Sequence, residues 1–229
     1  MNGGDDFLTH PLLCGAGVAH GFGQLGSKEP PGVVRPVQVH GNGVALVRLE
    51  GDTDPGHADA VVSTLAGVPV GVMTADCVAV LLAMEGGRVV AAVHAGWRGI
   101  AAGVVPRAFE AMLRFAAPSR RATAVIGPHI GPCCYEVDSP VIERLRVRFA
   151  ERLEDALTPA RPQHWMLDLG ALVRWDLIRA GLRPSDLGRF PDACTCCDAE
   201  RFASHRRDGA RAGRLLHWIA ARPAESRAP

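Results

Sequence analysis

The stretch AGVPVGVMTADCVAVLLAMEGGRVVAAVHAGWRG, residues 66–99, decides the fold of this chain. It holds three short runs rich in Val, Ala and Leu, at Val68–Thr74, Val78–Met84 and Val89–His94. Apolar runs of this length that are bounded by turn residues are typical of buried strands. The sequence Glu-Gly-Gly at 85–87 supplies a tight turn before the third run. We therefore expect three buried strands in this stretch.

The same stretch contains the longest apolar segment of the chain, Ala66–Met84, which we do not interpret as a membrane span. Asp76 interrupts the segment near its middle, and a bare carboxylate at the centre of a bilayer costs a few kcal/mol. Met1–Asp6 is acidic, whereas a secretory signal begins with basic residues. We therefore expect a cytoplasmic protein that does not contact a membrane.

Further strands are expected on both sides of this stretch, and helices are expected only after it. The candidate strands are Val33–Val39, Val44–Leu49, Ala60–Thr64, Ala122–Ile126 and Arg214–Ala220. The candidate helices run from Gly99 to about Ala117, from Ser139 to about Leu157, and from Leu169 to Ala180, where Gly181 is expected to form a left-handed cap. Residues 1–32 are rich in Gly and Pro and are expected to be irregular.

The order of these elements predicts the fold class. So many strands before the first helix argue against a simple alternating β-α-β chain. A chain of 229 residues can bury roughly 70–75% of the surface that it exposes when unfolded, so it needs no disulfide or metal merely to fold. We predict a single α+β domain over residues 1–229, in which mixed β-sheets are sandwiched with helices.

Charge and cysteine content narrow the classes of function. The 25 basic and 24 acidic side chains give a net charge of +1, without the basic excess that nucleic-acid binding requires. The seven cysteines are an odd number and are expected to be reduced, which favours metal binding or catalysis over disulfides. The neighbouring pairs Cys133–Cys134 and Cys196–Cys197 are poorly suited to bridge each other, because that geometry strains the intervening peptide.

Three motifs place a His or Cys beside glycine or a strand end. They are QVHG (38–41), TADC (74–77) and VHAGWRG (93–99). Together His40, Cys77 and His94 offer one thiolate and two imidazoles, a ligand set found in catalytic zinc sites that keep a fourth position for water or substrate. The turn that contains Arg98 would aim the first amides of a helix at an anion, with the guanidinium as a clamp.

Each of these residues also has a plainer interpretation. A His at a strand end is often a satisfied polar residue, and a Cys in a Val-rich strand is often a small hydrophobic residue. The cluster of Cys194, Cys196 and Cys197 competes as a metal site, although its spacing is tight for most zinc knuckles. The sequence GPCCYE at 131–136 fits either a rigid loop near a site or a tight turn.

Taken together, the motifs resemble the family known as laccase-like polyphenol oxidases, peptidoglycan editing factors or purine nucleoside phosphorylases. The resemblance implies a sandwich-like α+β fold with one zinc ion held by His40, Cys77 and His94. It also implies phosphorolysis of adenosine, inosine, guanosine and methylthioadenosine, with deamination of adenosine, so the expected partners are a small nucleoside and phosphate. The matching stretches include QVHG (38–41), ADAVVST (58–64), MTADCVAVLLA (73–83), AAVHAGWRG (91–99), IGPHIGPCCYEV (126–137) and FASHRRDGARAGR (202–214).

One segment departs from the family pattern. After His20-Gly21-Phe22 the family usually continues with a Thr-Arg-x-Gly-Gly-Val-Ser segment, whose Arg and Ser help to hold phosphate or substrate in relatives. Here the chain reads GQLGSK at 23–28 and soon reaches Gln38, so that Arg and Ser have no clear counterparts.

Three other functions fit the same residues. A cysteine hydrolase would use Cys77 as nucleophile and His94 or His40 as base, on an amide or acyl bond such as those of cell-wall precursors. A copper-dependent polyphenol oxidase is also open, because copper binds a Cys/His₂ site well. A zinc-stabilised binding module is the third, although closed structural sites use four ligands rather than three. The oligomeric state is left open.

Overall fold

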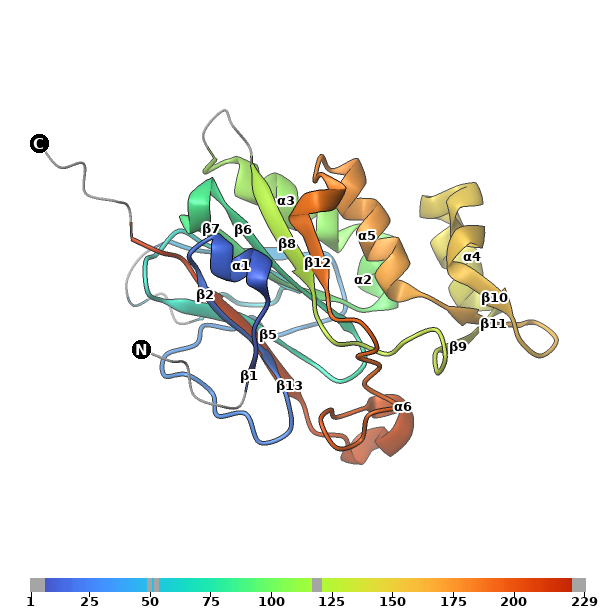
Figure 1. Ribbon diagram of the computed structural model, residues 1–229. Coiled ribbons are helices and arrows are strands. Elements are labelled where there is room, and N and C mark those ends of the chain that lie inside the picture. The colour runs from blue at the N-terminus through green and yellow to red at the C-terminus, as the bar shows by residue number, and fades with distance from the viewer. Residues whose placement is uncertain (1–6, 49–50, 52–53, 117–120, 224–229) are drawn as a thin grey trace, which may run out of the picture.

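Figure 1 shows the computed structural model of the protein, which describes residues 7–48, 51, 54–116 and 121–223. The strands are β1 (Phe7–Leu8), β2 (Ala19–Gly23), β3 (Val44–Val47), β4 (Ala60–Ser63), β5 (Pro69–Thr74), β6 (Val78–Met84), β7 (Val89–Ala95), β8 (Ala122–Ile126), β9 (Glu136–Asp138), β10 (Leu157–Pro159), β11 (His164–Leu167), β12 (Leu187–Arg189) and β13 (Leu215–Ala220). The α-helices are α1 (Pro11–Gly15), α2 (Trp97–Ala102), α3 (Val104–Leu113), α4 (Ser139–Phe149), α5 (Leu169–Arg179) and α6 (His205–Asp208).

A six-stranded mixed sheet forms the centre of the molecule, in the order β12-β8-β6-β7-β4-β3. The three strands predicted from residues 66–99 do not all lie in it: β6 and β7 pair antiparallel, whereas β5 belongs to a second sheet. The outer pairs, β3 with β4 and β8 with β12, are parallel, and the remaining pairs are antiparallel. The structure thus confirms the α+β class with mixed sheets.

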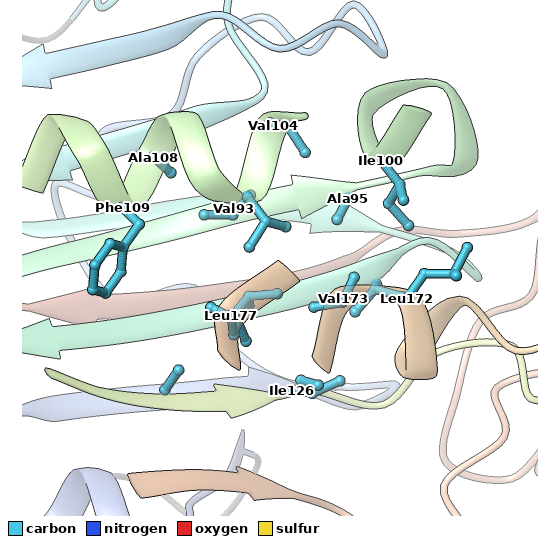
Figure 2. Close-up of a cluster of buried hydrophobic side chains, with 14 of the residues drawn as sticks. Val93, Ala95, Ile100, Val104, Ala108, Phe109, Ile126, Leu172, Val173 and Leu177 are labelled. Atoms are coloured by element: carbon cyan, nitrogen blue, oxygen red, sulfur yellow. The ribbon is translucent and has the colours of Figure 1, made fainter. Parts of the chain in front are cut away.

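Both faces of the central sheet are buried, which explains why its strands are apolar throughout. Because successive side chains of a strand point to opposite faces, β6 contributes Val80 and Leu82 to one core and Leu81 to the other. The first core lies against the helices, and Figure 2 shows side chains of α3 and α5 converging there on Val93 and Ile126. The central sheet is therefore a rigid platform for the loops at its edges.

The second core lies between the central sheet and a four-stranded antiparallel sheet in the order β1-β2-β13-β5. This sheet brings the N-terminal strand β2 beside β13 from the C-terminal end of the chain (Figure 1). The prediction that residues 1–32 are irregular is wrong for β1, α1 and β2. Position 23 requires glycine because β13 approaches β2 closely there: a Cβ at Gly23 would come within 2.9 Å of the backbone nitrogen of Leu216.

Three other predicted elements differ from the structure. Residues 33–39 make only single bridges, at Val34 and Val37, because Pro36 between them has no N–H for a ladder. The helix expected up to residue 117 is split into α2 and α3 at Gly103, whose φ is +81°. The helix expected from residue 139 ends at Phe149 and continues as a 3₁₀ turn, because Ala150 has a φ of +47°.

The remaining elements are a small third sheet and the helix α5. A small antiparallel sheet, β10-β11-β9, lies beside α4. The predicted helix at 169–180 is α5, and Gly181 follows it with a φ of +111° as expected of a cap. Within the described ranges, the structure has no helix that is both long and apolar enough to cross a membrane.

Candidate functional site

The structure brings His40, Cys77 and His94 together at one end of the central sheet. Their ligand atoms all lie within 4.8 Å of one another, and the two imidazole rings are perpendicular with centroids 4.8 Å apart. The pairing of β6 with β7 explains half of this geometry. Ala79 is the partner of His94 in that ladder, so Cys77, just before β6, lies beside the end of β7. His40 reaches the same point from the loop before β3.

Asp59, the residue before β4, is fully buried and contacts both the His94 ring and the backbone at His40. Its Oδ1 lies 2.8 Å from Nδ1 of His94, which leaves Nε2 as the ring nitrogen available to a ligand. The same carboxylate accepts the backbone N–H groups of His40 (2.9 Å) and Gly41 (2.6 Å). A carboxylate behind a ligating imidazole is the usual support of a metal-bound His. The sequence analysis did not single out this residue.

Asp76 fixes the turn that presents Cys77. Its φ is +89°, a conformation that costs about 1–3 kcal/mol for a residue other than Gly and that persists only when neighbours hold it. Its buried carboxylate accepts a hydrogen bond from the hydroxyl of Thr195 (2.7 Å) and one from the backbone N–H of Arg206 (2.6 Å). Two C-terminal segments therefore determine where the Cys77 thiol points.

The charges of the cluster favour a thiolate. Burial raises the pKa of Cys77, but hydrogen bonds and positive charge from His40 and His94 outweigh it and lower the pKa to about 7. Burial likewise lowers the pKa of His94, and its hydrogen bonds to Asp59 and Cys77 outweigh that effect and raise the pKa to about 9. A metal ion would replace the shared protons as the positive partner of the thiolate.

Gly96 leaves room for the cluster at the start of α2. A Cβ at this position would lie 3.0 Å from the Cys77 sulfur and 3.4 Å from the His40 ring. The backbone therefore approaches the three side chains more closely than any other residue would allow.

A cavity of 440 Å³ opens onto the three side chains, a size that suits a small organic molecule. Two of its lining residues, His205 and Arg214, are basic and were not identified from the sequence. Arg98, the predicted anion clamp, does not line it: the side chain is exposed and lies over the Trp97 ring at 4.4 Å. The other lining residues are Gln38, Met73, Thr74 and Ala75.

The two other cysteine segments meet each other rather than this cavity. The sulfur atoms of Cys133, Cys134, Cys194 and Cys197 form a second group within 4.8 Å. The sequence analysis had treated the segments separately, and it had included Cys196, which is not in the group.

Comparison with known proteins places the chain among its relatives. Residues 20–222 match the sequence model of the family described as multi-copper polyphenol oxidoreductase laccase. The chain belongs to this family. A purine nucleoside phosphorylase of Xylella fastidiosa (strain Temecula1) is 42% identical over 167 residues, which cover 71% of this chain and 61% of the relative. This chain thus aligns with about three fifths of that protein.

Two further comparisons concern Geobacillus stearothermophilus. Its purine nucleoside phosphorylase YlmD is 35% identical over 196 residues, covering 81% of this chain and 70% of that one. The crystal structure of YlmD superposes with a TM-score of 0.84 at 26% identity, over 97% of this chain and 98% of the other. The family resemblance and the fold inferred from the motifs are confirmed.

Proposed function

We propose that this protein is a zinc-dependent purine nucleoside phosphorylase acting on adenosine, inosine, guanosine and methylthioadenosine, and that it also deaminates adenosine. The observation that supports this most directly is that His40, Cys77 and His94 lie together and line the 440 Å³ cavity. The names of the relatives support the nucleoside as substrate class.

The donor set fits zinc. One thiolate and two imidazoles are ligands that Zn²⁺ prefers, and three protein ligands leave a coordination position open for chemistry. Asp59 behind His94 and the close approach at Gly96 are what a preformed site requires. A bound Zn²⁺ supplies a positive charge that polarises a ligand or lowers the pKa of a water molecule.

The residues of the chain then have separable tasks. Asp59 fixes the tautomer and orientation of His94, and Asp76 fixes the turn at Cys77. Arg214 offers positive charge to phosphate at the cavity wall, and His205 offers an imidazole nitrogen beside it. In phosphorolysis a phosphate oxygen bonds to C1′ of the ribose as the bond to the purine nitrogen breaks. In deamination water adds to C6 of the purine and ammonia leaves.

Arg98 is retained in this proposal as a second candidate for anion binding. It lies in the first turn of α2, directly after the strand that carries His94. Burial raises the pKa of Tyr135 to about 12; the charge of Cys77 adds to this effect, and the charge of Arg98 opposes it.

A specific observation favours a second function, a cysteine hydrolase. The Cys77 thiol lies between two imidazoles and has a pKa of about 7, as an activated nucleophile does. This function predicts turnover without metal, and rapid alkylation of Cys77 near neutral pH in the chelator-treated protein.

The deciding experiment combines metal content with turnover. Protein purified without added metal is analysed for zinc and copper beside the Cys77→Ala variant, and both are assayed with adenosine and inosine, with and without phosphate. We expect zinc bound at His40, Cys77 and His94 to be lost in the variant, together with turnover. A zinc-loaded protein that consumes neither nucleoside would overturn the proposal. Copper at this site with phenol oxidation would favour the polyphenol oxidase instead.

A further inference from the structure

Four cysteines from two loops far apart in the sequence meet at the surface of the protein. Cys133 and Cys134 belong to the loop between β8 and β9, and Cys194 and Cys197 to the segment after β12. The parallel pairing of β8 with β12 brings the two loops side by side. The bridge between His129 and Cys194 extends that pairing, and the backbone N–H of Thr195 donates to the carbonyl of His129 at 3.1 Å.

The sulfur atoms have the spacing of ligands around one ion. The Cys197 sulfur lies 3.6 Å from that of Cys133 and 3.3 Å from that of Cys134, and all four lie within 4.8 Å of one another. A tetrahedron of sulfurs at the usual Zn–S distance of about 2.3 Å has edges of about 3.8 Å. All seven cysteines of the chain are free thiols in the structure.

The backbone supports a thiolate at Cys194. The N–H of Gly131 donates to the Cys194 sulfur at 3.2 Å, the kind of outer contact that supports a charged sulfur ligand. A Cβ on Gly131 would lie 3.2 Å from the Cys133 sulfur and 3.3 Å from Cβ of Cys194, so only glycine fits without displacement. The backbone at Gly131 therefore both packs closely against the sulfurs and donates a hydrogen bond to one of them.

Two arginines bring positive charge to the same loops. The guanidinium of Arg206 donates to the carbonyl of Cys134 at 3.2 Å, and that of Arg207 donates to the carbonyl of Cys196 at 3.2 Å. Four thiolates around a divalent cation carry a net charge of −2, which Arg206 offsets in part, whereas Arg207 also pairs with Asp208 at 2.8 Å. Free thiols would gain little from the same arrangement.

We propose that Cys133, Cys134, Cys194 and Cys197 bind one structural Zn²⁺ ion, separate from any metal at Cys77. Four sulfur ligands complete the coordination of zinc, so this site leaves no position for a substrate. Binding replaces thiol protons, which are released to solvent, by the metal. The ion would clamp the loop after β12 to the loop after β8.

This clamp bears on the candidate metal centre through one carboxylate. Thr195 lies between two of the proposed ligands, and its hydroxyl donates to Asp76 beside Cys77. The zinc ion is therefore expected to stiffen the outer support of the Cys77 turn without touching a substrate. The inference does not depend on the proposed reaction, since it concerns ligands outside the cavity.

The test measures zinc per chain in four variants purified without added metal. In the Cys77→Ala background we expect about one zinc ion per chain, because the four-cysteine site is intact. Adding Cys197→Ser is expected to remove that ion, whereas adding Cys14→Ser, which changes an exposed cysteine outside both groups, is expected to retain it. The zinc content of Cys197→Ser alone measures the metal bound by His40, Cys77 and His94.

A spectroscopic measurement keeps the test decisive if the Cys197→Ser chains do not fold. Cobalt(II) is loaded into the Cys77→Ala protein, and a strong sulfur-to-cobalt charge-transfer band is expected, since the only grouped thiolates left are the four proposed ligands. Equal zinc in the Cys77→Ala/Cys197→Ser and Cys77→Ala/Cys14→Ser double variants would overturn the site. So would iron in place of zinc, or a mass lower by two hydrogens per disulfide in protein that has no metal.

Discussion

The two sulfur-containing groups of this protein differ in ligand number, in ligand type and in where the fold places them. Cys77 and His94 lie at the ends of β6 and β7 in the buried central sheet, His40 lies in the loop before β3, and all three line a cavity, where a buried carboxylate orients His94. The other group is four sulfurs on two surface loops, supported by a backbone N–H. Three ligands at a cavity suit chemistry, whereas four on loops suit a cross-link.

Removing one sulfur from each group is expected to give the largest difference between the two groups. Cys77→Ala is expected to lower kcat/KM for adenosine phosphorolysis about a thousandfold, because a metal contributes several kcal/mol to the transition state. Cys197→Ser is expected to lower it less than about tenfold while it lowers the melting temperature, because its zinc only supports the fold. Steady-state kinetics and thermal denaturation on both variants check this. The reverse order of activities would show that the roles are exchanged.

Asp59 is the next test, because only the first group has a carboxylate behind an imidazole. Asp59→Asn is expected to weaken zinc binding at this site by about 10–100-fold, the usual effect of losing such a partner. Competition with a chromophoric chelator measures the affinity. Asp176→Asn is the matched control. Asp176 is also buried and pairs with Arg148 at a distance of 2.6 Å, and it does not line the 440 Å³ cavity. An equal loss in both variants would indicate general destabilisation.

Substitutions of arginines at or near the cavity wall are expected to have smaller effects, on the KM for phosphate. Arg214→Ala is expected to raise the KM for phosphate about tenfold, since it removes a charge-assisted hydrogen-bond donor from the cavity. Arg98→Ala is expected to change it less than about twofold, because its exposed guanidinium lies over Trp97. Initial rates at varied phosphate concentration separate the two. A larger effect at Arg98 would restore it as the main anion-binding residue.

Another buried imidazole, that of His217, shows by contrast what Asp59 does for His94. His217 is fully buried next to the Thr74 hydroxyl, 2.8 Å away, and no carboxylate of the described residues pairs with it. Burial, aided by the charge of His94, lowers its pKa to about 3, whereas the partner Asp59 helps to raise that of His94. The unfolded state therefore binds more protons than the folded state between pH 3 and the ordinary pKa of 6.5.

The consequence is a loss of stability in acid. As the pH falls below about 6.5, His217 is expected to lower the free energy of unfolding by up to about 1.4 kcal/mol per pH unit. Denaturant titrations of the metal-free protein at pH 7, 6 and 5 should show a shallower slope in His217→Gln. His57→Gln, at an exposed position, serves as the control. Identical slopes in all three proteins would contradict the assignment.

The three residues singled out in the sequence lie together in the first group. For Cys77 and His94 this follows from the local pairing of β6 with β7, whereas His40 comes from a loop whose position that pairing does not fix. The sequence did not reveal Asp59, since a carboxylate before an apolar strand has no pattern of its own. The second group was missed because residues 133–134 and 194–197 meet only through the pairing of β8 with the three-residue strand β12. Strand β2 was missed because its glycines indicate loop, whereas here they allow close packing.

The hydrogen bonds to Asp76 also set the order in which the protein can be completed during synthesis. The residues His40, Cys77 and His94 have all been made once residue 94 leaves the ribosome. The turn that presents Cys77 is nevertheless held by Thr195 and Arg206, which are made more than a hundred residues later. Strand β5, which leads into that turn, pairs with β13 near the end of the chain. The centre therefore takes its final form only after the residues up to Ala220 at the end of β13 have been made.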